Sequence, residues 1–466
     1  MTDNRPARPP VIQTRGAGDA ENAPLPTTPH SLDPSPRTSL TYASLQLLIA
    51  YVTLAIVNYV PAFYASEVGI PMLAISALML LSRGLDVITD PLIGFLSDRT
   101  SSRLGRRKPW ILAGAPVLLL GCWLLFLPPD HAGKLYFLAG ISILFLGLTM
   151  VQLPYVAWGA ELASSYDGRT RVTSLRERVG ALGSICALLT AFVVARAGHE
   201  NLRPVLEVMT WVIFLCLPPL ILLAVRRVPA GHPHIGEHVP FFHGAMIAFR
   251  NRSFRLFALA ILLLYIGITP GGAVGWFLFD HYFSRPDLYA PSLLLEFIAS
   301  FIGLPVWTAI AVRTSKHRAL SYALLWIALF TAVIPLMAAF GVWGIIVTIT
   351  LRSLALGALL MLPMAIIADV IDLDAATTGT QRTGVYMAFG GIVVKFAITV
   401  GVAAALAIPG LFGFDATSHA NSDTALFSVI GTYSWMPGLF FLAAVPLFWR
   451  FPLDRSELAK AQAALD

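Results

Sequence analysis

The chain has 466 residues, of which 57% are hydrophobic and 12% are charged, and its mean hydropathy is +0.73. A soluble globular protein carries about twice that share of charged residues, and so little polar surface could not cover one large water-soluble body. The composition therefore excludes an ordinary soluble enzyme and predicts an all-α polytopic membrane protein. At roughly 20 residues for each span, the length accommodates about twelve transmembrane helices.

The net charge of +6 does not indicate a nucleic acid partner, because the basic residues occur in short clusters between apolar runs and not on one broad face. The three Cys residues lie in apolar segments and lack the spacing of a metal site or a disulfide framework. No nucleophile–base pair or cluster of metal ligands indicates an enzyme. We therefore expect neither catalytic residues nor a cofactor.

Two sets of six apolar segments follow a polar tail. Residues 1–40 are rich in Pro, Thr, Ser, Asn and Asp, a composition that predicts disorder. Residues 41–225 and 256–450 each form a set, separated by a polar connector at 226–255 and followed by a tail at 451–466. The predicted spans are 42–64, 71–96, 109–128, 134–162, 179–197, 204–225, 256–279, 288–312, 318–340, 343–369, 383–410 and 424–449. This layout is typical of transporters built from two six-helix bundles with a site at the shared midplane.

The basic residues of the loops predict the orientation in the membrane. Clusters follow spans two, four and eight, whereas the other side carries only Lys134, Arg196, Arg203 and Arg285. An even number of spans places both termini on the basic side. We expect an integral protein of a bacterial inner membrane with both termini in the cytoplasm.

The second span carries three charged residues, and a charge at mid-bilayer costs roughly 2.5–3.5 kcal/mol. Asp86 and Asp90 are four residues apart and share a helix face with Arg83. Two such carboxylates can coordinate a hard cation such as Na⁺ or relay a proton. The alternative is an ion cluster that joins helices, in which Arg83 neutralises one carboxylate. We expect no metal beyond a transported Na⁺ at this pair.

Three further charges lie in apolar segments, at Glu296, Arg352 and Lys395. Glu296 and Arg352 would form a natural ion pair, or each could line an aqueous cavity and meet a solute. Aromatic residues such as Tyr155 could stack on a sugar, but they are equally expected at helix contacts.

The loop between spans two and three contains Gly94-Phe-Leu-Ser-Asp98-Arg99 and Gly105-Arg106-Arg107-Lys108. An acid that faces arginines at a tight loop predicts a charge latch between helices, with Asp98, Arg99, Arg106 and Arg107 as its members. The alternative is charge that only sets the topology.

This loop resembles the signature loop of the major facilitator superfamily. The longer stretch from Arg83 to Trp110 resembles the glycoside–pentoside–hexuronide:cation symporters, the relatives of melibiose permease. Four more segments agree, namely 153–162, 169–176, 304–307, and 368–372 followed by Lys395. The resemblance covers nearly all of the chain after residue 40, and it implies a major-facilitator-type fold of two bundles that rock around a central site.

The resemblance also implies roles for individual residues. Asp86 and Asp90 match the cation-site aspartates of the family, and Thr149 falls at a further cation-site position. Arg176 matches an arginine beside the sugar site, and Lys395 matches a lysine that organises both sites. Two acids of the family are replaced, by Ala50 and by Gln152. Because hard cations prefer several anionic oxygens, proton coupling is favoured over sodium coupling.

The predicted function is cation-coupled symport of a sugar, glycoside or sugar acid by alternating access, by a protein that can work as a monomer in the lipid bilayer. One alternative is a carrier of a lysolipid or another organic anion, which Arg352 would serve. Another is a membrane receptor that does not transport. We assign cation coupling to Asp86, Asp90, Thr149 and Gln152, and substrate binding to Arg83, Tyr155, Arg176, Arg352 and Lys395.

Overall fold

The computed structural model describes residues 33–163, 166–198, 201–231, 241–378 and 382–452, and all regular structure within these ranges is helical. Most of the predicted tail at 1–40, nearly all of the tail at 451–466 and part of the connector lie outside the described residues. The first helix begins at Pro36, because the Ser35 hydroxyl accepts a hydrogen bond from the Thr38 amide and Pro36 is the first helical residue.

The helices of the first half are α1 Pro36–Asn58, α2 Val60–Ser66, α3 Met72–Arg99, α4 Lys108–Phe126, α5 Lys134–Leu162, α6 Tyr166–Arg196 and α7 Arg203–Arg227. The connector contains a short helix, α8 Phe241–Arg250. The second half begins with α9 Arg252–Ile268, α10 Pro270–Phe277, a π-helical turn at Leu278–Tyr282, a 3₁₀ turn at Pro286–Leu288 and α11 Tyr289–Arg313. It continues with α12 Lys316–Ala332, α13 Ile334–Met337, a 3₁₀ turn at Ala338–Phe340, α14 Gly341–Ser353, α15 Leu356–Thr378, α16 Thr383–Leu411 and α17 Asp423–Trp449.

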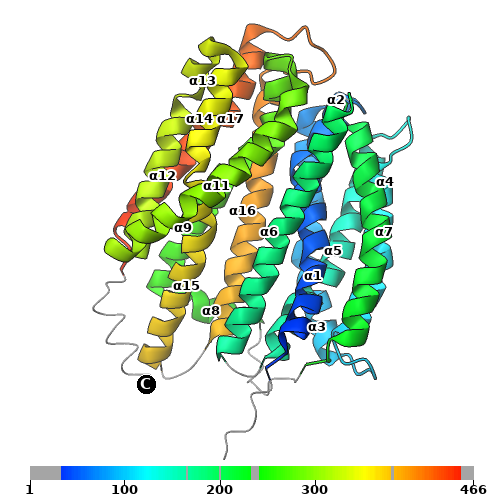
Figure 1. Cartoon of the computed structure of the whole chain (residues 1–466), viewed down its shortest axis with the longest axis vertical. Helices are drawn as coiled ribbons and strands as arrows, with labels where there is room; N and C mark the ends of the chain where they lie inside the picture. The colour runs from blue at the N-terminus through cyan, green and yellow to red at the C-terminus, as the bar shows by residue number, and fades with distance from the viewer. Residues whose placement is uncertain (1–32, 164–165, 199–200, 232–240, 379–381, 453–466) are drawn as a thin grey trace, which may run out of the picture.

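These helices make twelve passes. Within the described residues, eleven continuous helical segments are long and apolar enough to cross a membrane. One of them, Lys316–Thr378, has 63 residues, which is far longer than a single span of about 20 residues requires. It reverses direction at Gly341, whose positive φ of 72° favours glycine, so it crosses twice (Figure 1). The predicted twelve-helix fold is confirmed.

The tenth pass is interrupted between α14 and α15, and this break shapes the centre of the second half. The Leu354 carbonyl lies at the break and accepts a hydrogen bond from the Trp307 indole at 2.9 Å. A side chain at Gly303 would meet that carbonyl at 1.8 Å, so α11 can approach the break only with glycine at this position. The close approach places α11 beside Arg352 near the end of α14.

Among the described residues, the two halves share a continuous apolar core at one end of the molecule. In Figure 1 the first half lies on the right and the second half on the left. The core of the first half continues into α10, the start of α11 and the last turns of α16, whereas a separate core in the second half runs along the lower parts of α9, α12 and α17. At the shared end, the Ser76 hydroxyl of α3 donates to the Ala403 carbonyl of α16 at 2.7 Å. The halves are therefore packed together at this end.

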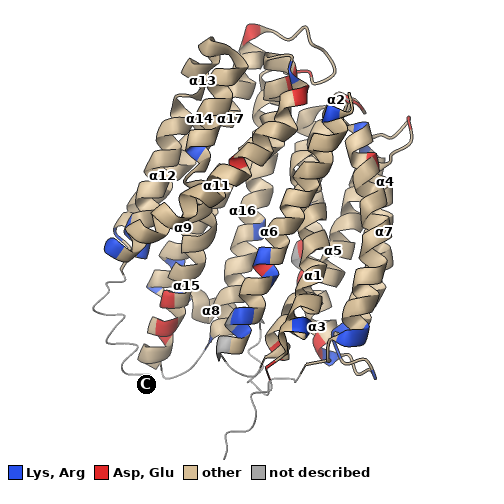
Figure 2. Cartoon of the chain, in the orientation of Figure 1, with Lys and Arg blue, Asp and Glu red and all other residues tan. Residues whose placement is uncertain are grey.

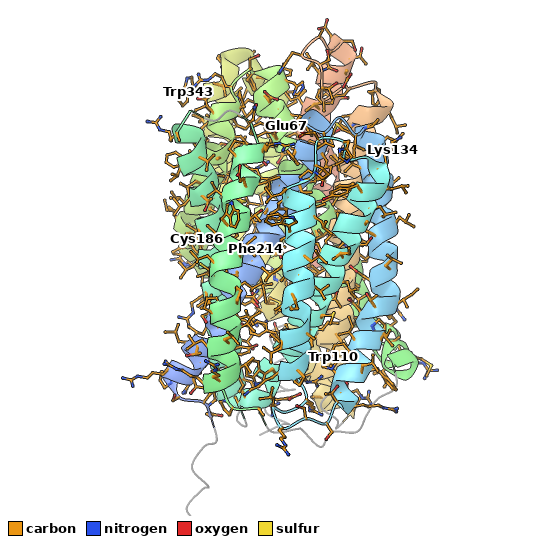
Figure 3. The ribbon with its side chains drawn as sticks, turned by 90° about the vertical axis from the view of Figure 1, so that its right-hand side faces the viewer. Glu67, Trp110, Lys134, Cys186, Phe214 and Trp343 are labelled. Atoms are coloured by element: carbon orange, nitrogen blue, oxygen red, sulfur yellow. The ribbon has the colours of Figure 1, made fainter. Side chains whose placement is uncertain are left out.

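We name the two ends by their charge. The basic end carries the loops after α3 and α11, where many of the Lys and Arg residues lie (Figure 2). The opposite end is the one at which the halves share a core. Figure 3 places Trp110 near the basic end and Trp343 near the opposite end. Amphipathic aromatic rings gather at the two membrane–water interfaces, so these residues indicate the boundaries of the membrane-embedded region.

Candidate functional site

An ion pair joins the two halves near the middle of the molecule. Asp90 on α3 and Lys395 on α16 are 305 residues apart in sequence, and the Lys395 ammonium lies 2.6 Å from Asp90 Oδ2. The Thr149 hydroxyl on α5 donates to Asp90 Oδ1 at 3.0 Å. The side chains of Asp90 and Lys395 retain 19% and 36% of their exposure. The structure therefore brings three of the predicted site residues together around one carboxylate that is not sealed in protein.

The second carboxylate of α3 has its own partner on the same helix. Arg83 donates to Asp86 Oδ2 at 2.8 Å, and its guanidinium lies 3.5 Å from the centroid of the Phe145 ring. Asp86 is buried. For Asp86, the structure thus shows the alternative that the sequence left open, in which Arg83 neutralises one carboxylate. Among the described contacts, no hydrogen bond joins Gln152 to either carboxylate, and its role in cation coupling stays a prediction.

Glu296 and Arg352 form the ion pair that their apolar surroundings predicted. Arg352 on α14 donates to Glu296 Oε2 on α11 at 2.7 Å, and the Ser353 hydroxyl donates to the same oxygen at 3.1 Å. Both side chains are buried, and the guanidinium faces the Tyr433 ring at 5.4 Å. All of these groups belong to the second half. Arg352 is occupied by this pair in the observed conformation, and its role in substrate binding stays a prediction.

Arg176 on α6 pairs with its neighbour Glu177, at 2.6 Å between Nη2 and Oε1. The Glu177 side chain is 60% exposed and lies within electrostatic reach of Tyr265 on α9, in the other half. An exposed charge within a membrane-spanning helix is expected to face water and not lipid. Glu177 is therefore expected to face the space between the halves, whereas Arg176 is largely buried and interacts with Tyr42 of α1, in the first half. Sequence reasoning missed Glu177, although its place in the run Arg176-Glu177-Arg178 was a signal.

Tyr155 takes part in a helix contact. Its ring stacks on Tyr42 of α1 with 4.5 Å between centroids. Each tyrosine hydroxyl donates to the backbone carbonyl of the other residue at 3.0 Å. Tyr155 is fully buried, so in this conformation it joins α1 to α5, and its contact with a substrate stays a prediction.

The predicted charge latch at the basic end is centred on Arg107. Its guanidinium binds Asp98 at 2.5 Å and Glu161 at 2.9 Å, and it donates to the Ser97 hydroxyl at 2.8 Å. Arg106 also binds Glu161 at 2.9 Å. The network joins the ends of α3 and α5 to the start of α4, all within the first half.

Arg99 differs from the other predicted members of the latch. Its guanidinium lies 4.0 Å from the centroid of the Phe95 ring. Glu161 was not predicted as a member, although an acid at the end of an apolar span was a signal for it. The second half contains a related contact, in which Lys316 binds Asp369 at 2.6 Å.

Comparison with known proteins agrees with this architecture. A family model described as MFS/sugar transport protein matches residues 41–455. The inner membrane symporter YicJ of Escherichia coli is 24% identical over 406 residues, covering 84% of this chain and 86% of the relative. The glucuronide carrier protein homolog of Escherichia coli is 20% identical over 415 residues, covering 87% and 90%. The sodium-dependent lysophosphatidylcholine symporter 1-A of Danio rerio is 21% identical over 420 residues, covering 81% and 78%.

The crystal structure of a D-xylose–proton symporter has the same fold, with a TM-score of 0.62 at 15% identity, over 89% of this chain and 97% of that one. The fold and the charged centre thus define a membrane transporter of the major facilitator superfamily. Within it, the chain belongs to the MFS sugar transport proteins, in the family of glycoside–pentoside–hexuronide:cation symporters. It is an integral membrane protein that carries out secondary transport of the symport type.

Proposed function

We propose that this protein couples the movement of protons to the movement of a sugar, glycoside or sugar acid. The observation that carries the proposal is the ion pair between Asp90 and Lys395, which joins the two halves and stays partly exposed. Secondary transport requires that a small cation change the contacts between two rocking halves. A single proton that binds a carboxylate paired across the halves changes the contact between them.

The proposed cycle depends on the charge of Asp90. Proton binding removes the negative charge of Asp90, so the attraction to Lys395 is lost and α3 can separate from α16. Solute binds between the halves, beside the Arg176–Glu177 pair and the released Lys395 ammonium. The carrier rocks when proton and solute are both bound, and it re-forms the ion pair after both have left. The shared core at the opposite end and the positive-inside rule support an observed state that is closed to the outside, with the basic end in the cytoplasm.

Proton coupling is favoured over sodium coupling by the surroundings of the two carboxylates. Asp86 is paired with Arg83, and the Lys395 ammonium lies 2.6 Å from Asp90. A hard cation needs several oxygen ligands, whereas a proton needs a single oxygen. Gln152 and Ala50 supply no carboxylate where the family resemblance places one.

The solute class is tested first by a thermal-shift screen of sugars, glycosides and uronates on purified protein, because a ligand of the folded state raises its melting temperature. A ligand found in this way is then followed in liposomes under an imposed proton or sodium gradient. We expect accumulation under the proton gradient and its collapse in a protonophore. Accumulation that follows sodium and ignores the protonophore would contradict proton coupling.

A lysolipid carrier is the second candidate, because one relative is named as a lysophosphatidylcholine symporter. The same screen separates the two candidates. Stabilisation by lysolipids and by none of the sugars, glycosides or uronates would select the lysolipid carrier and exclude the sugar carrier.

A further inference from the structure

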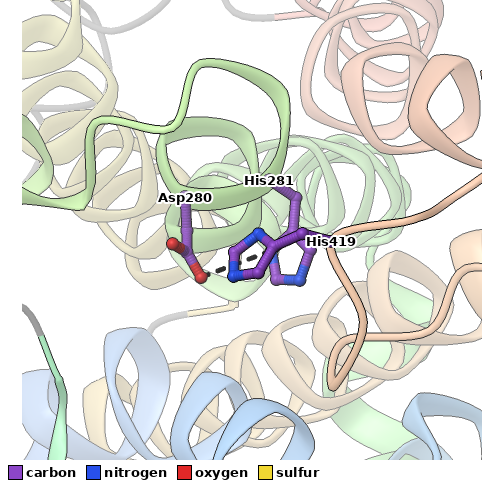
Figure 4. A group of neighbouring side chains, drawn as sticks. All are labelled: Asp280, His281 and His419. Carbon is purple, nitrogen blue, oxygen red and sulfur yellow. Dashed lines mark ion pairs between the residues drawn. The ribbon is translucent and has the colours of Figure 1, made fainter.

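Three side chains with metal-ligating atoms meet at the opposite end of the second half. Asp280 and His281 lie in the π-helical turn at Leu278–Tyr282, and His419 lies in the loop between α16 and α17. Their ligand atoms all lie within 4.8 Å of one another. Figure 4 shows the carboxylate of Asp280 beside the two imidazole rings. The trio joins two segments that are far apart in sequence, and it takes no part in the central site.

The hydrogen bonds of His281 leave one buried nitrogen without a donor or acceptor partner. Nε2 lies 3.1 Å from the Ala416 carbonyl, which can only accept a hydrogen bond, so Nε2 carries the hydrogen. In the neutral ring, Nδ1 then has a lone pair. The His281 side chain is only 2% exposed, and Nδ1 has no hydrogen-bond partner among the described residues.

This Nδ1 lone pair faces a negatively charged oxygen. Asp280 Oδ2 lies 3.4 Å from Nδ1, so two electron-pair donors face each other in a largely buried place, which is unfavourable without a cation between them. Metal bonds of about 2.0–2.2 Å at the tetrahedral angle hold two ligand atoms about 3.3–3.5 Å apart. The observed separation therefore fits two ligands of one tetrahedral metal ion.

The loop that carries His419 is held in shape by its own hydrogen bonds. The amide and hydroxyl of Thr417 donate to Asp415 Oδ1, which holds the pKa of that carboxyl below its usual range. The Asn421 side chain binds the amide and carbonyl of Asp415. Phe414 packs on the His281 ring with 5.0 Å between centroids. The loop thus presents His419 next to the Asp280–His281 pair, where its exposed ring stacks on the His281 ring with 4.8 Å between centroids. Two stacked rings cannot both aim a nitrogen at one ion, so metal binding requires the His419 ring to rotate out of this stack.

We propose that Asp280, His281 Nδ1 and a ring nitrogen of His419 bind one divalent transition metal ion of the Zn²⁺ type at this end of the molecule. Imidazole and carboxylate are ligands that suit Zn²⁺, and three protein ligands leave a fourth position for water. The Nε2–H bond to the Ala416 carbonyl is the outer contact that orients a metal-binding histidine. The metal fastens the loop between α16 and α17 to the π-helical turn after α10.

The experiment measures Zn²⁺ binding by calorimetry on purified, metal-free full-length protein. The variants are His419→Gln, which changes an exposed ligand, and Asp280→Asn. The matched control is His131→Gln, because His131 is exposed in a loop outside the trio. The chain has ten histidines, so the comparison between variants, and not the total stoichiometry, is decisive.

We expect His419→Gln and Asp280→Asn each to bind one equivalent of Zn²⁺ fewer than the unchanged protein or His131→Gln, or to bind that equivalent at least tenfold more weakly. Zn²⁺ should also raise the melting temperature of the unchanged protein more than that of His419→Gln, whose metal-free melting temperature should equal that of the control. Equal Zn²⁺ binding by all four proteins would overturn the proposal. So would a loss shared by His131→Gln.

Discussion

Two ion pairs of nearly equal length lie inside the membrane-embedded region, and they differ in their surroundings. Asp90 and Lys395 are 2.6 Å apart, belong to different halves and keep 19% and 36% of their side-chain exposure. Glu296 and Arg352 are 2.7 Å apart, belong to the second half and keep 10% and 8%. Each residue of the first pair can give up its partner and bind water, a proton or a solute instead. The second pair cannot do so without unpacking the second half.

The comparison shows that distance alone does not identify a functional ion pair. The desolvation penalty of a buried pair makes it costly to break, which suits a contact that stays intact while the halves move. A partly exposed pair between moving bodies can form and break in each cycle. We therefore propose a coupling role for Asp90 and Lys395, and a structural role for Glu296 and Arg352.

The largest expected effect follows from Lys395→Met. A membrane potential of 100 mV acting on one charge supplies about 2.3 kcal/mol, which corresponds to about fiftyfold accumulation. Without the ammonium, the charge of Asp90 no longer controls the contact between the halves, so accumulation should fall to the level of equilibration. Uptake into liposomes measures this. Lys395→Arg, which keeps the positive charge, is the control and should retain some accumulation; a fully active Lys395→Met would contradict the assigned role.

Breaking the buried pair should reduce stability. Arg352→Leu leaves the Glu296 carboxylate buried and unpaired, which costs about 3–5 kcal/mol. The melting temperature of the purified protein should fall clearly. The double variant Glu296→Leu/Arg352→Leu should recover most of this loss, because replacing both partners by apolar groups is often neutral. A double variant less stable than Arg352→Leu would argue against a structural pair.

Within the latch, Arg107 and Arg99 should differ. Arg107 contacts two acids and a hydroxyl, and hydrogen bonds to charged groups contribute about 1.5–3 kcal/mol. Arg107→Gln should therefore lower the melting temperature, and it should also reduce the transport rate several-fold. Among the described residues, the contact of the Arg99 guanidinium is with the Phe95 ring, so Arg99→Gln should behave like the unchanged protein. If the two variants had equal effects, the latch would not be centred on Arg107.

The smallest expected effect is that of Asp86→Asn. The introduced amide can still accept a hydrogen bond from Arg83, and the Arg83 guanidinium keeps its contact with Phe145. Asp86 is buried, but Arg83 keeps 27% of its side-chain exposure, and a partly exposed pair within one helix contributes about 0.2–1 kcal/mol. Accumulation in liposomes should therefore fall by no more than about fivefold. Loss of accumulation as complete as in Lys395→Met would place Asp86 in the coupling site as well.

The twelve passes could be predicted from sequence because about 20 apolar residues are needed for each span. The pairing of Glu296 with Arg352 was predictable for a similar reason, since each charge needs a partner in apolar surroundings. The contact between Asp90 and Lys395 follows from no local pattern, because it depends on how the two halves pack; only the family resemblance indicated that Lys395 belongs to the cation and sugar sites. The break between α14 and α15, the inclusion of Glu161 in the latch and the Asp280–His281–His419 trio were missed as well, although each of them lies within one half. Each depends on tertiary contacts that no local pattern encodes.

The most direct test of the account is to measure accumulation and solute exchange on the same liposomes containing Asp90→Asn. This variant abolishes the charge that a proton would otherwise neutralise, and it keeps the size of the side chain. We expect exchange of internal for external solute to continue at a rate similar to that of the unchanged protein, and accumulation against a gradient to be lost. Undiminished accumulation by Asp90→Asn under a proton gradient would contradict it.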